Sequence, residues 1–114
     1  MTFQDSIRTV LSKYATFTGR ASRPEYWWWV LGLLVAFGIT GLIDRMIFGP
    51  DTAILGGLLS LAVILPNIAV GVRRLHDTDR SGWWLALTLI PIIGLLVLIW
   101  FMIQPGTPGA NRFG

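Results

Sequence analysis

Residues 26–43 have the sequence YWWWVLGLLVAFGITGLI, an uncharged stretch that decides the fold class. As an α-helix these 18 residues would be about 27 Å long, close to the bilayer hydrocarbon core of about 30 Å. Two later stretches are similar: residues 52–72 carry no charge, and residues 82–103 are the apolar part of a longer uncharged run. Each can cross a membrane as a helix, in which the backbone groups satisfy one another.

The composition of the whole chain also indicates a membrane protein. Its 114 residues are 54% hydrophobic and only 13% charged, whereas a typical soluble domain has about 25% charged residues. This excludes a soluble enzyme, a disordered chain and a nucleic-acid-binding domain. The chain has no cysteine, which excludes a disulfide framework and a cysteine nucleophile. We therefore expect a single all-α integral membrane domain over residues 1–114.

Helix signals mark the beginning of the first span. Ser22 can cap the amide of Glu25, whose carboxylate can return the bond. Pro24 falls in the first turn, where its missing N–H does no harm. We expect three transmembrane helices and a short tail, over residues 24–43, 53–72, 82–103 and 104–114.

An amphipathic pattern precedes the first span. Thr2 and Asp5 have the spacing of a capping box. Apolar side chains then recur at helical spacing, with polar ones on the opposite face. We expect an interfacial helix over residues 2–17; the alternative is a helix packed on a partner or on loops of this protein. The apolar positions are Phe3, Ile7, Val10, Leu11, Tyr14 and Phe17.

The distribution of Lys and Arg predicts the orientation. Four lie before the first span and three between the second and third, but only one in each remaining polar segment. Three spans would therefore place the N-terminus in the cytoplasm and the tail outside. No signal peptide is expected, because the first apolar run lacks a small-residue cleavage site. Pro91 and Gly94 also allow a re-entrant hairpin that returns the tail to the cytoplasm. We favour the kinked span, because hairpin backbone in lipid needs protein cover.

Basic and aromatic residues border the spans on the side predicted to be cytoplasmic. Arginine suits bidentate phosphate contacts, so these residues form a candidate face for anionic lipid or a partner. The alternative is simple anchoring, by cations at helix ends and tryptophans at the interface. The candidate residues are Arg20, Arg23, Trp27, Arg73, Arg74, His76, Asp77, Arg80, Trp83 and Trp84.

Few polar residues lie inside the spans, and none is ionisable. Gly56 and Ser60 are small residues four apart, a spacing that lets helices approach closely. Pro66 frees the carbonyl of Ala62, and the neighbouring Asn67 can hydrogen-bond a nearby helix. We assign Gly56, Ser60 and Asn67 to helix packing. Proton pumps and ion-coupled transporters usually hold charges at membrane depth, so that class is disfavoured.

No constellation of catalytic or metal-ligating residues is evident. One histidine with two nearby carboxylates is not a ligand set of known spacing, and no Gly-x-Ser-x-Gly motif or phosphate-binding glycine loop is present. We expect no enzyme activity, no cofactor and no metal. A lipid-modifying enzyme would need a pocket around His76, Asp77 and Asp79.

Three blocks of sequence resemble a known family. They are FTGRASRPEYW at 17–27, RRLHDTDRSGWW at 73–84 and GTPGANRFG at 106–114. In combination they are similar to the bacterial inner-membrane family called domain of unknown function 805. The resemblance implies a small multi-pass protein of the bacterial cytoplasmic membrane, and brings no reaction or substrate. Family motifs in the loop and the tail would meet most simply on one side of the membrane, which keeps the re-entrant alternative open.

The expected function is that of a non-enzymatic membrane component. It would bind membrane lipids, including anionic ones, or a larger membrane complex through its basic-aromatic cytoplasmic face. The alternative is a homo-oligomeric small transporter or channel, for which several copies would be needed to enclose a pore.

Overall fold

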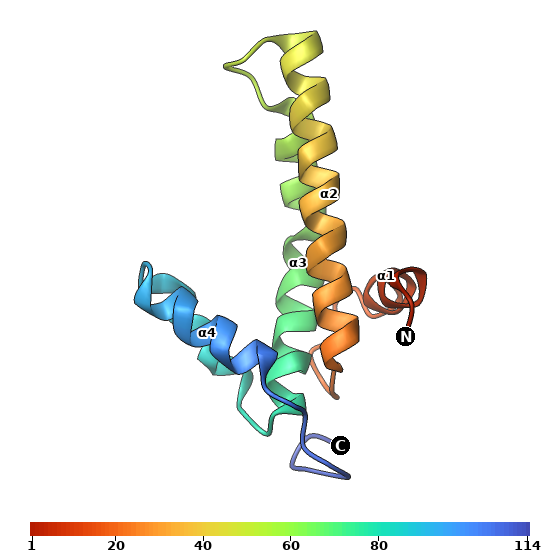
Figure 1. Cartoon of the computed structure of the whole chain (residues 1–114), viewed down its shortest axis with the longest axis vertical. Coiled ribbons are helices and arrows are strands. Elements are labelled where there is room, and N and C mark those ends of the chain that lie inside the picture. Colours follow the sequence, from red (N-terminus) through yellow and green to blue (C-terminus); the bar gives the residue numbers. More distant parts are fainter.

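The computed structural model describes all 114 residues and is entirely helical, which confirms the all-α fold class (Figure 1). It contains four α-helices and one 3₁₀ helix. They are α1 (Phe3–Ser12), α2 (Arg23–Phe48), α3 (Ile54–Asp77), η1 (Gly82–Leu89) and α4 (Ile93–Ile103).

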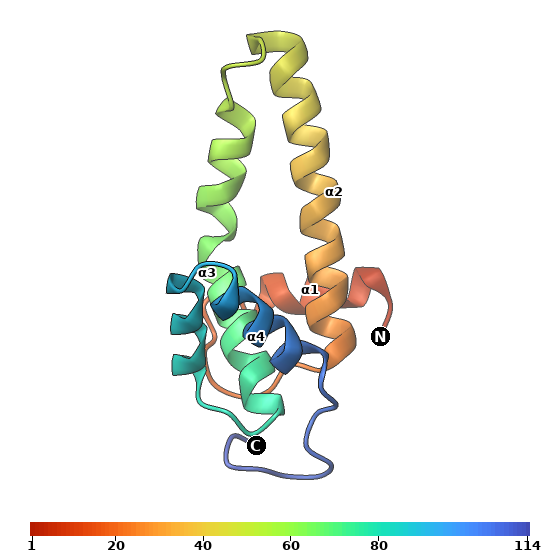
Figure 2. The ribbon, with the colours of Figure 1, turned by 60° about the vertical axis from the view of Figure 1, so that its left-hand side comes forward.

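Two long antiparallel helices, α2 and α3, form a stalk (Figure 2). They contain 26 and 24 residues, and both are apolar and long enough to cross a bilayer. Most of their apolar side chains point outward; Leu34 and Leu61, for example, are 68% and 70% exposed. The stalk is therefore stable only where a nonaqueous environment covers this surface. The predicted span 24–43 lies within α2, and the predicted span 53–72 begins at Ala53, the N-cap residue of α3, and otherwise lies within that helix.

The helix α1 lies beside the lower part of α2, at the end of the stalk that carries both termini, which we call the base (Figure 1). Thr2 and Asp5 form the predicted capping box, and the bond from the Thr2 backbone holds the pKa of the Asp5 carboxyl below its usual value. The helix is shorter than predicted and ends at Ser12. Its flank with Ser6 and Val10 is buried, so it packs on its own chain, while other apolar side chains stay exposed.

The structure corrects the third predicted span. Residues 82–103 do not form one continuous helix: η1 runs outward from the base, the chain turns at residues 90–92, and α4 returns to the base (Figure 1). The two arms pack against each other as a hairpin. The tail over 104–114 consequently lies at the same end of the molecule as the N-terminus, as in the re-entrant alternative.

Local hydrogen bonds satisfy three amides at the turn of the hairpin and so reduce the protein cover that the turn needs. The amides of Ile90, Ile93 and Gly94 donate to carbonyls within the turn at 2.7–3.1 Å, and Pro91 has no amide to satisfy. A side chain on Gly94 would overlap the backbone carbonyl of Leu87. Gly94 therefore lets the two arms cross closely instead of merely kinking one helix.

Polar contacts also join the helices of the stalk. The Trp29 indole N–H on α2 donates to the Asn67 side chain on α3 at 2.6 Å, so Asn67 contacts the neighbouring helix. The Ala62 carbonyl, which Pro66 leaves free, accepts the hydroxyl of Tyr14 from the segment after α1. The sequence alone did not identify Tyr14 as the partner of this carbonyl.

The far end of the stalk is closed by a buried carboxylate that sequence reasoning missed. Asp44, on α2, is only 2% exposed. Its two oxygens accept the amides of Leu55 and Gly56 at 2.9 and 3.0 Å and thereby cap α3. Gly56 thus lies at this helix contact. Ser60 instead donates to the Gly56 carbonyl of its own helix and is exposed.

Candidate functional site

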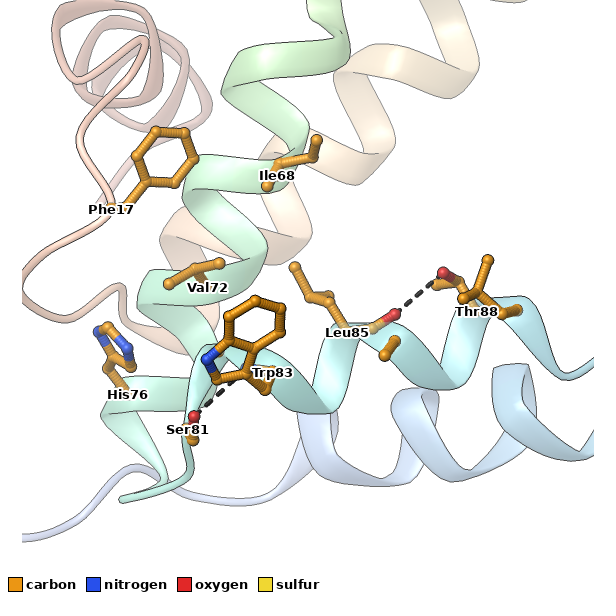
Figure 3. A pocket seen from close by; sticks show the side chains of 11 residues that line it. Phe17, Ile68, Val72, His76, Ser81, Trp83, Leu85 and Thr88 are labelled. Atoms are coloured by element: carbon orange, nitrogen blue, oxygen red, sulfur yellow. Dashed lines mark hydrogen bonds between the residues drawn. The ribbon is translucent and has the colours of Figure 1, made fainter.

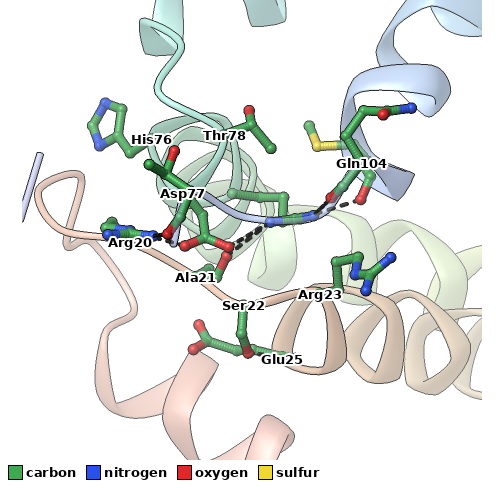
Figure 4. A network of polar contacts seen from close by, with 12 residues as sticks. Arg20, Ala21, Ser22, Arg23, Glu25, His76, Asp77, Thr78 and Gln104 are labelled. Atoms are coloured by element: carbon green, nitrogen blue, oxygen red, sulfur yellow. Dashed lines mark hydrogen bonds and ion pairs between the residues drawn. The ribbon is translucent and has the colours of Figure 1, made fainter. Parts of the chain in front are cut away.

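The three sequence blocks meet at the base in one polar network (Figure 4). The segment before α2, the end of α3 and the tail each contribute side chains or carbonyls. We call this assembly the base network, and it consists of Arg20, Glu25, Arg73, Arg74, His76, Asp77 and residues 104–114.

Arg74 is the connection between α3 and the C-terminal hairpin. It is fully buried, because the end of α4 and the first tail residues pass over it. Its guanidinium forms an ion pair with Asp77 at 2.7 Å and donates to the carbonyl of Met102 at 3.1 Å and to that of Gln104. Charge-assisted bonds of this kind are stronger than neutral ones, so Arg74 fixes the position of α4.

Arg73 points to a different partner. It is also fully buried and forms an ion pair with Glu25, which is 4% exposed. Ser6 of α1 donates to the Glu25 carbonyl at 2.5 Å, so this pair lies where α1, α2 and α3 meet. Ser22 caps the Glu25 amide as predicted, at 3.4 Å, but the carboxylate binds Arg73 instead of returning the bond to Ser22. Two nitrogens of Arg73, Nε and one terminal nitrogen, have no partner.

Arg20 clamps the tail to the end of α3. Its Nε donates to Asp77 at 2.8 Å, and its terminal nitrogens donate to the carbonyls of Thr107 and Gly109 at 2.5 Å. The Thr107 amide in turn donates to the Asp77 carbonyl at 2.7 Å. Asp77 therefore bridges two arginines and the tail. A side chain on Gly106 would overlap the Asp77 carboxylate, which explains glycine at that position.

His76 is held by two segments that are distant in sequence. Its Nδ1 lies 2.9 Å from the Gly19 carbonyl, and its ring stacks on Phe113, with ring centres 3.9 Å apart. Asn111 donates to the His76 carbonyl at 2.8 Å. The tail thereby covers one face of the imidazole.

The rim of the base carries an exposed ion pair between Arg112 and Asp79, at 3.1 Å. The hydrogen bonds from Arg112 hold the pKa of the Asp79 carboxyl below its usual value. Nearby, the Arg80 guanidinium lies 4.2 Å from the centre of the Phe101 ring, a cation–π contact.

The structure divides the predicted face into buried and accessible residues. Arg73, Arg74 and His76 are buried, and Asp77 is bound by two arginines. Arg73, Arg74 and Asp77 connect parts of the protein to one another and do not form an accessible face, and His76 is accessible only where its ring lines a groove. Trp27 donates its indole N–H to the Met102 carbonyl at 3.1 Å. The exposed members are Arg23, Trp83 and Trp84.

Other exposed cations complete the surface of the base. Arg8, Lys13 and Arg23 are exposed and have no carboxylate partner. Arg23 lines a shallow groove of about 350 Å³ together with Trp27 and Ile103, where its guanidinium lies beside an apolar wall. Such a surface can hold an anionic headgroup above an acyl chain. The described side chains include no group of three potential metal ligands.

A larger apolar groove of about 590 Å³ lies in the angle between α3 and η1 (Figure 3). Ile68 and Val72 of α3 form one wall, and Trp83 and Leu85 belong to η1. Sequence reasoning could not locate this groove, because it exists only where the hairpin folds back beside α3. His76 and Ser81 lie together at one end of it (Figure 3).

Comparison with known proteins agrees with the motifs described above. The family model described as "Protein of unknown function (DUF805)" matches residues 14–114. Inner membrane protein YhaH of Escherichia coli K12 is 48% identical over 108 residues, covering 92% of this chain and 89% of its own. Inner membrane protein YhaI of the same strain is 45% identical over 106 residues, covering 93% and 89%. No solved structure matches the chain.

Proposed function

The chain belongs to the DUF805 family, and relatives at 45–48% identity are named as inner membrane proteins. We propose that it is a non-enzymatic inner-membrane component that binds anionic phospholipid at its base. The observation that carries this proposal is the set of exposed, unpaired cations Arg8, Lys13 and Arg23 beside apolar surface. The buried arginines of the base network position these residues and do not bind lipid themselves.

The proposed arrangement has two transmembrane helices, α2 and α3, with α1 at the interface and the hairpin re-entering from the base. Eight of the nine Lys and Arg residues then lie at the base, with four acidic residues, while Arg45 lies at the far end with two acidic residues. The positive-inside rule places such a base in the cytoplasm. Both termini, including Arg112, are therefore assigned to the cytoplasmic side.

Cysteine labelling tests this orientation, since the natural chain has no cysteine. Three single variants, Thr2→Cys, Asp51→Cys and Ala110→Cys, are exposed to a membrane-impermeant maleimide in spheroplasts. We expect only Asp51→Cys to react before lysis and all three to react after it. Reaction of Ala110→Cys in intact spheroplasts, with Thr2→Cys protected, would contradict the arrangement and favour three spans.

Lipid retention tests the proposed function. The purified protein is incorporated into nanodiscs that contain equal amounts of phosphatidylglycerol and phosphatidylethanolamine, and lipid that remains bound is counted by native mass spectrometry. A cation near an anionic surface contributes about 1 kcal/mol, or roughly fivefold in affinity. We therefore expect the preference for phosphatidylglycerol to fall at least fivefold in the triple variant Arg8→Gln/Lys13→Gln/Arg23→Gln.

The matched control is Arg45→Gln, which removes an exposed cation from the far end of the stalk. We expect this variant to retain the preference of the wild type. An equal preference in the wild type and the triple variant, or an equal loss in Arg45→Gln, would exclude the base as the lipid-binding surface.

A further inference from the structure

The groove between α3 and η1 is continuous with the apolar surface that faces the membrane. At its upper end, Ile68 is 43% exposed on α3, and at its outer end Leu89 is 83% exposed on η1. No other segment of the chain fills this space of about 590 Å³. Because the lining is apolar and opens beside the stalk, an acyl chain from the surrounding lipid fits it better than a polar ligand does.

His76 supplies a polar atom at the end of the groove where Ser81 also lies (Figure 3). The side chain is more than nine-tenths buried, and its Nδ1 faces a backbone carbonyl, that of Gly19, at 2.9 Å. A carbonyl only accepts, so Nδ1 carries the proton. In this tautomer Nε2 is an acceptor. It has no hydrogen-bond partner within the protein, and the ring lines the groove.

Ser81 supplies the complementary group. Its oxygen accepts the backbone amide of Trp83 at 3.3 Å, which leaves its O–H free to donate. The third polar side chain in the lining, Thr88, donates its hydroxyl to the Leu85 carbonyl of its own helix at 2.9 Å. This end of the groove thus offers one acceptor and one donor, the two kinds of group that a ligand hydroxyl can bind.

We propose that this groove holds one acyl chain of a phospholipid whose headgroup carries a free hydroxyl, with that hydroxyl bound between His76 and Ser81. The inference rests on the proposed function, because it assigns a chemical identity to a lipid that binds at the base. The exposed cations attract any anionic phospholipid, whereas this groove distinguishes among anionic phospholipids by their headgroup hydroxyls.

Two anionic lipids of equal charge separate the two effects. Nanodiscs contain equal amounts of phosphatidylglycerol, which has headgroup hydroxyls, and phosphatidylethanol, which has none. A pair of hydrogen bonds in a water-poor site changes affinity by about tenfold. We expect the wild type to retain phosphatidylglycerol over phosphatidylethanol by three- to tenfold in native mass spectrometry.

Two variants each remove one of the polar groups together with one structural contact, the stacking of His76 on Phe113 or the bond from the Trp83 amide to Ser81. In His76→Asn, the amide nitrogen can still donate to the Gly19 carbonyl, but the acceptor at Nε2 is lost. Ser81→Ala removes the donor, and we expect both variants to retain the two lipids about equally. The matched control Thr88→Val alters a lining hydroxyl that is already used, and it should keep the selectivity of the wild type.

Each outcome has a defined meaning. Equal retention of the two lipids by the wild type overturns the hydroxyl site but leaves the proposed anionic-lipid binding intact. Unchanged selectivity in either His76→Asn or Ser81→Ala also overturns it, so one folded variant is enough for the test. Retention of neither lipid by the wild type overturns both proposals.

Discussion

Replacement of Arg74 by methionine is expected to destabilise the protein by about 3–5 kcal/mol and to release the C-terminal hairpin from the base. Methionine fills a similar volume but leaves the Met102 and Gln104 carbonyls without their donor, and it removes one of the two cations on Asp77. We expect α2 and α3 to remain paired, because the Trp29–Asn67 bond and the cap by Asp44 join them at other places. The free energy of unfolding is measured by SDS titration in mixed micelles.

Limited proteolysis of the tail reports the second part of this prediction. Residues after Gln104 should be cleaved much faster in Arg74→Met than in the wild type. The control is Arg112→Ala, which breaks the exposed pair with Asp79. Surface pairs contribute little, so this variant should leave the unfolding midpoint unchanged. A tail that stays protected in Arg74→Met would show that the guanidinium does not hold the hairpin.

Removal of the Glu25 carboxylate is expected to have a comparable effect at the other side of the base network. In Glu25→Ala, the guanidinium of Arg73 keeps its charge but loses its carboxylate, at a site with 0% exposure. An uncompensated buried charge costs about 3–5 kcal/mol. We expect a loss of unfolding free energy in this range, together with weaker packing of α1, since Ser6 binds the same turn of α2.

The double variant Glu25→Leu/Arg73→Met separates the cost of an orphaned charge from the value of the pair. Replacing a buried ion pair by apolar residues of similar volume is often neutral, so most of the lost stability should return. The control Asp51→Ala removes an exposed carboxylate that has no ion-pair partner. We expect this control to leave the free energy of unfolding unchanged. A double variant as unstable as Glu25→Ala would contradict this assignment.

The parts of the fold that sequence predicted well are those decided by length and composition. The runs at 26–43 and 52–72 are bounded by charges and match the stalk. The hairpin was an alternative that the sequence did not favour, because Pro91 and Gly94 do not show which carbonyls the turn amides bind. The positive φ of Ile92, 64°, is likewise set by the crossing of η1 and α4 and by no local signal.

The candidate site was predicted as a set of residues but not as an arrangement. Arg73 and Arg74 are neighbours in sequence, and successive helical residues point about 100° apart. They therefore reach different partners, Glu25 and the tail. The positive-inside rule assigns both arginines to the cytoplasmic side of the membrane. The rule does not say whether an arginine side chain on that side is solvated or buried. The sequence did contain one indication that the arginines form ion pairs: the carboxylates Glu25 and Asp77 lie within the same blocks of sequence.

The buried cap formed by Asp44 has a consequence for how the protein enters the membrane. The carboxylate lies at the end of α2, but the amides that satisfy it belong to the beginning of α3. A lone α2 would carry an unsatisfied charge across the hydrocarbon, which is costly. The free-energy cost of moving Asp44 across the membrane is lower when α3 is already present, because the amides of Leu55 and Gly56 then bind the carboxylate. For the proposed two-span arrangement, we therefore expect α2 and α3 to insert as one hairpin, after α3 has been synthesised.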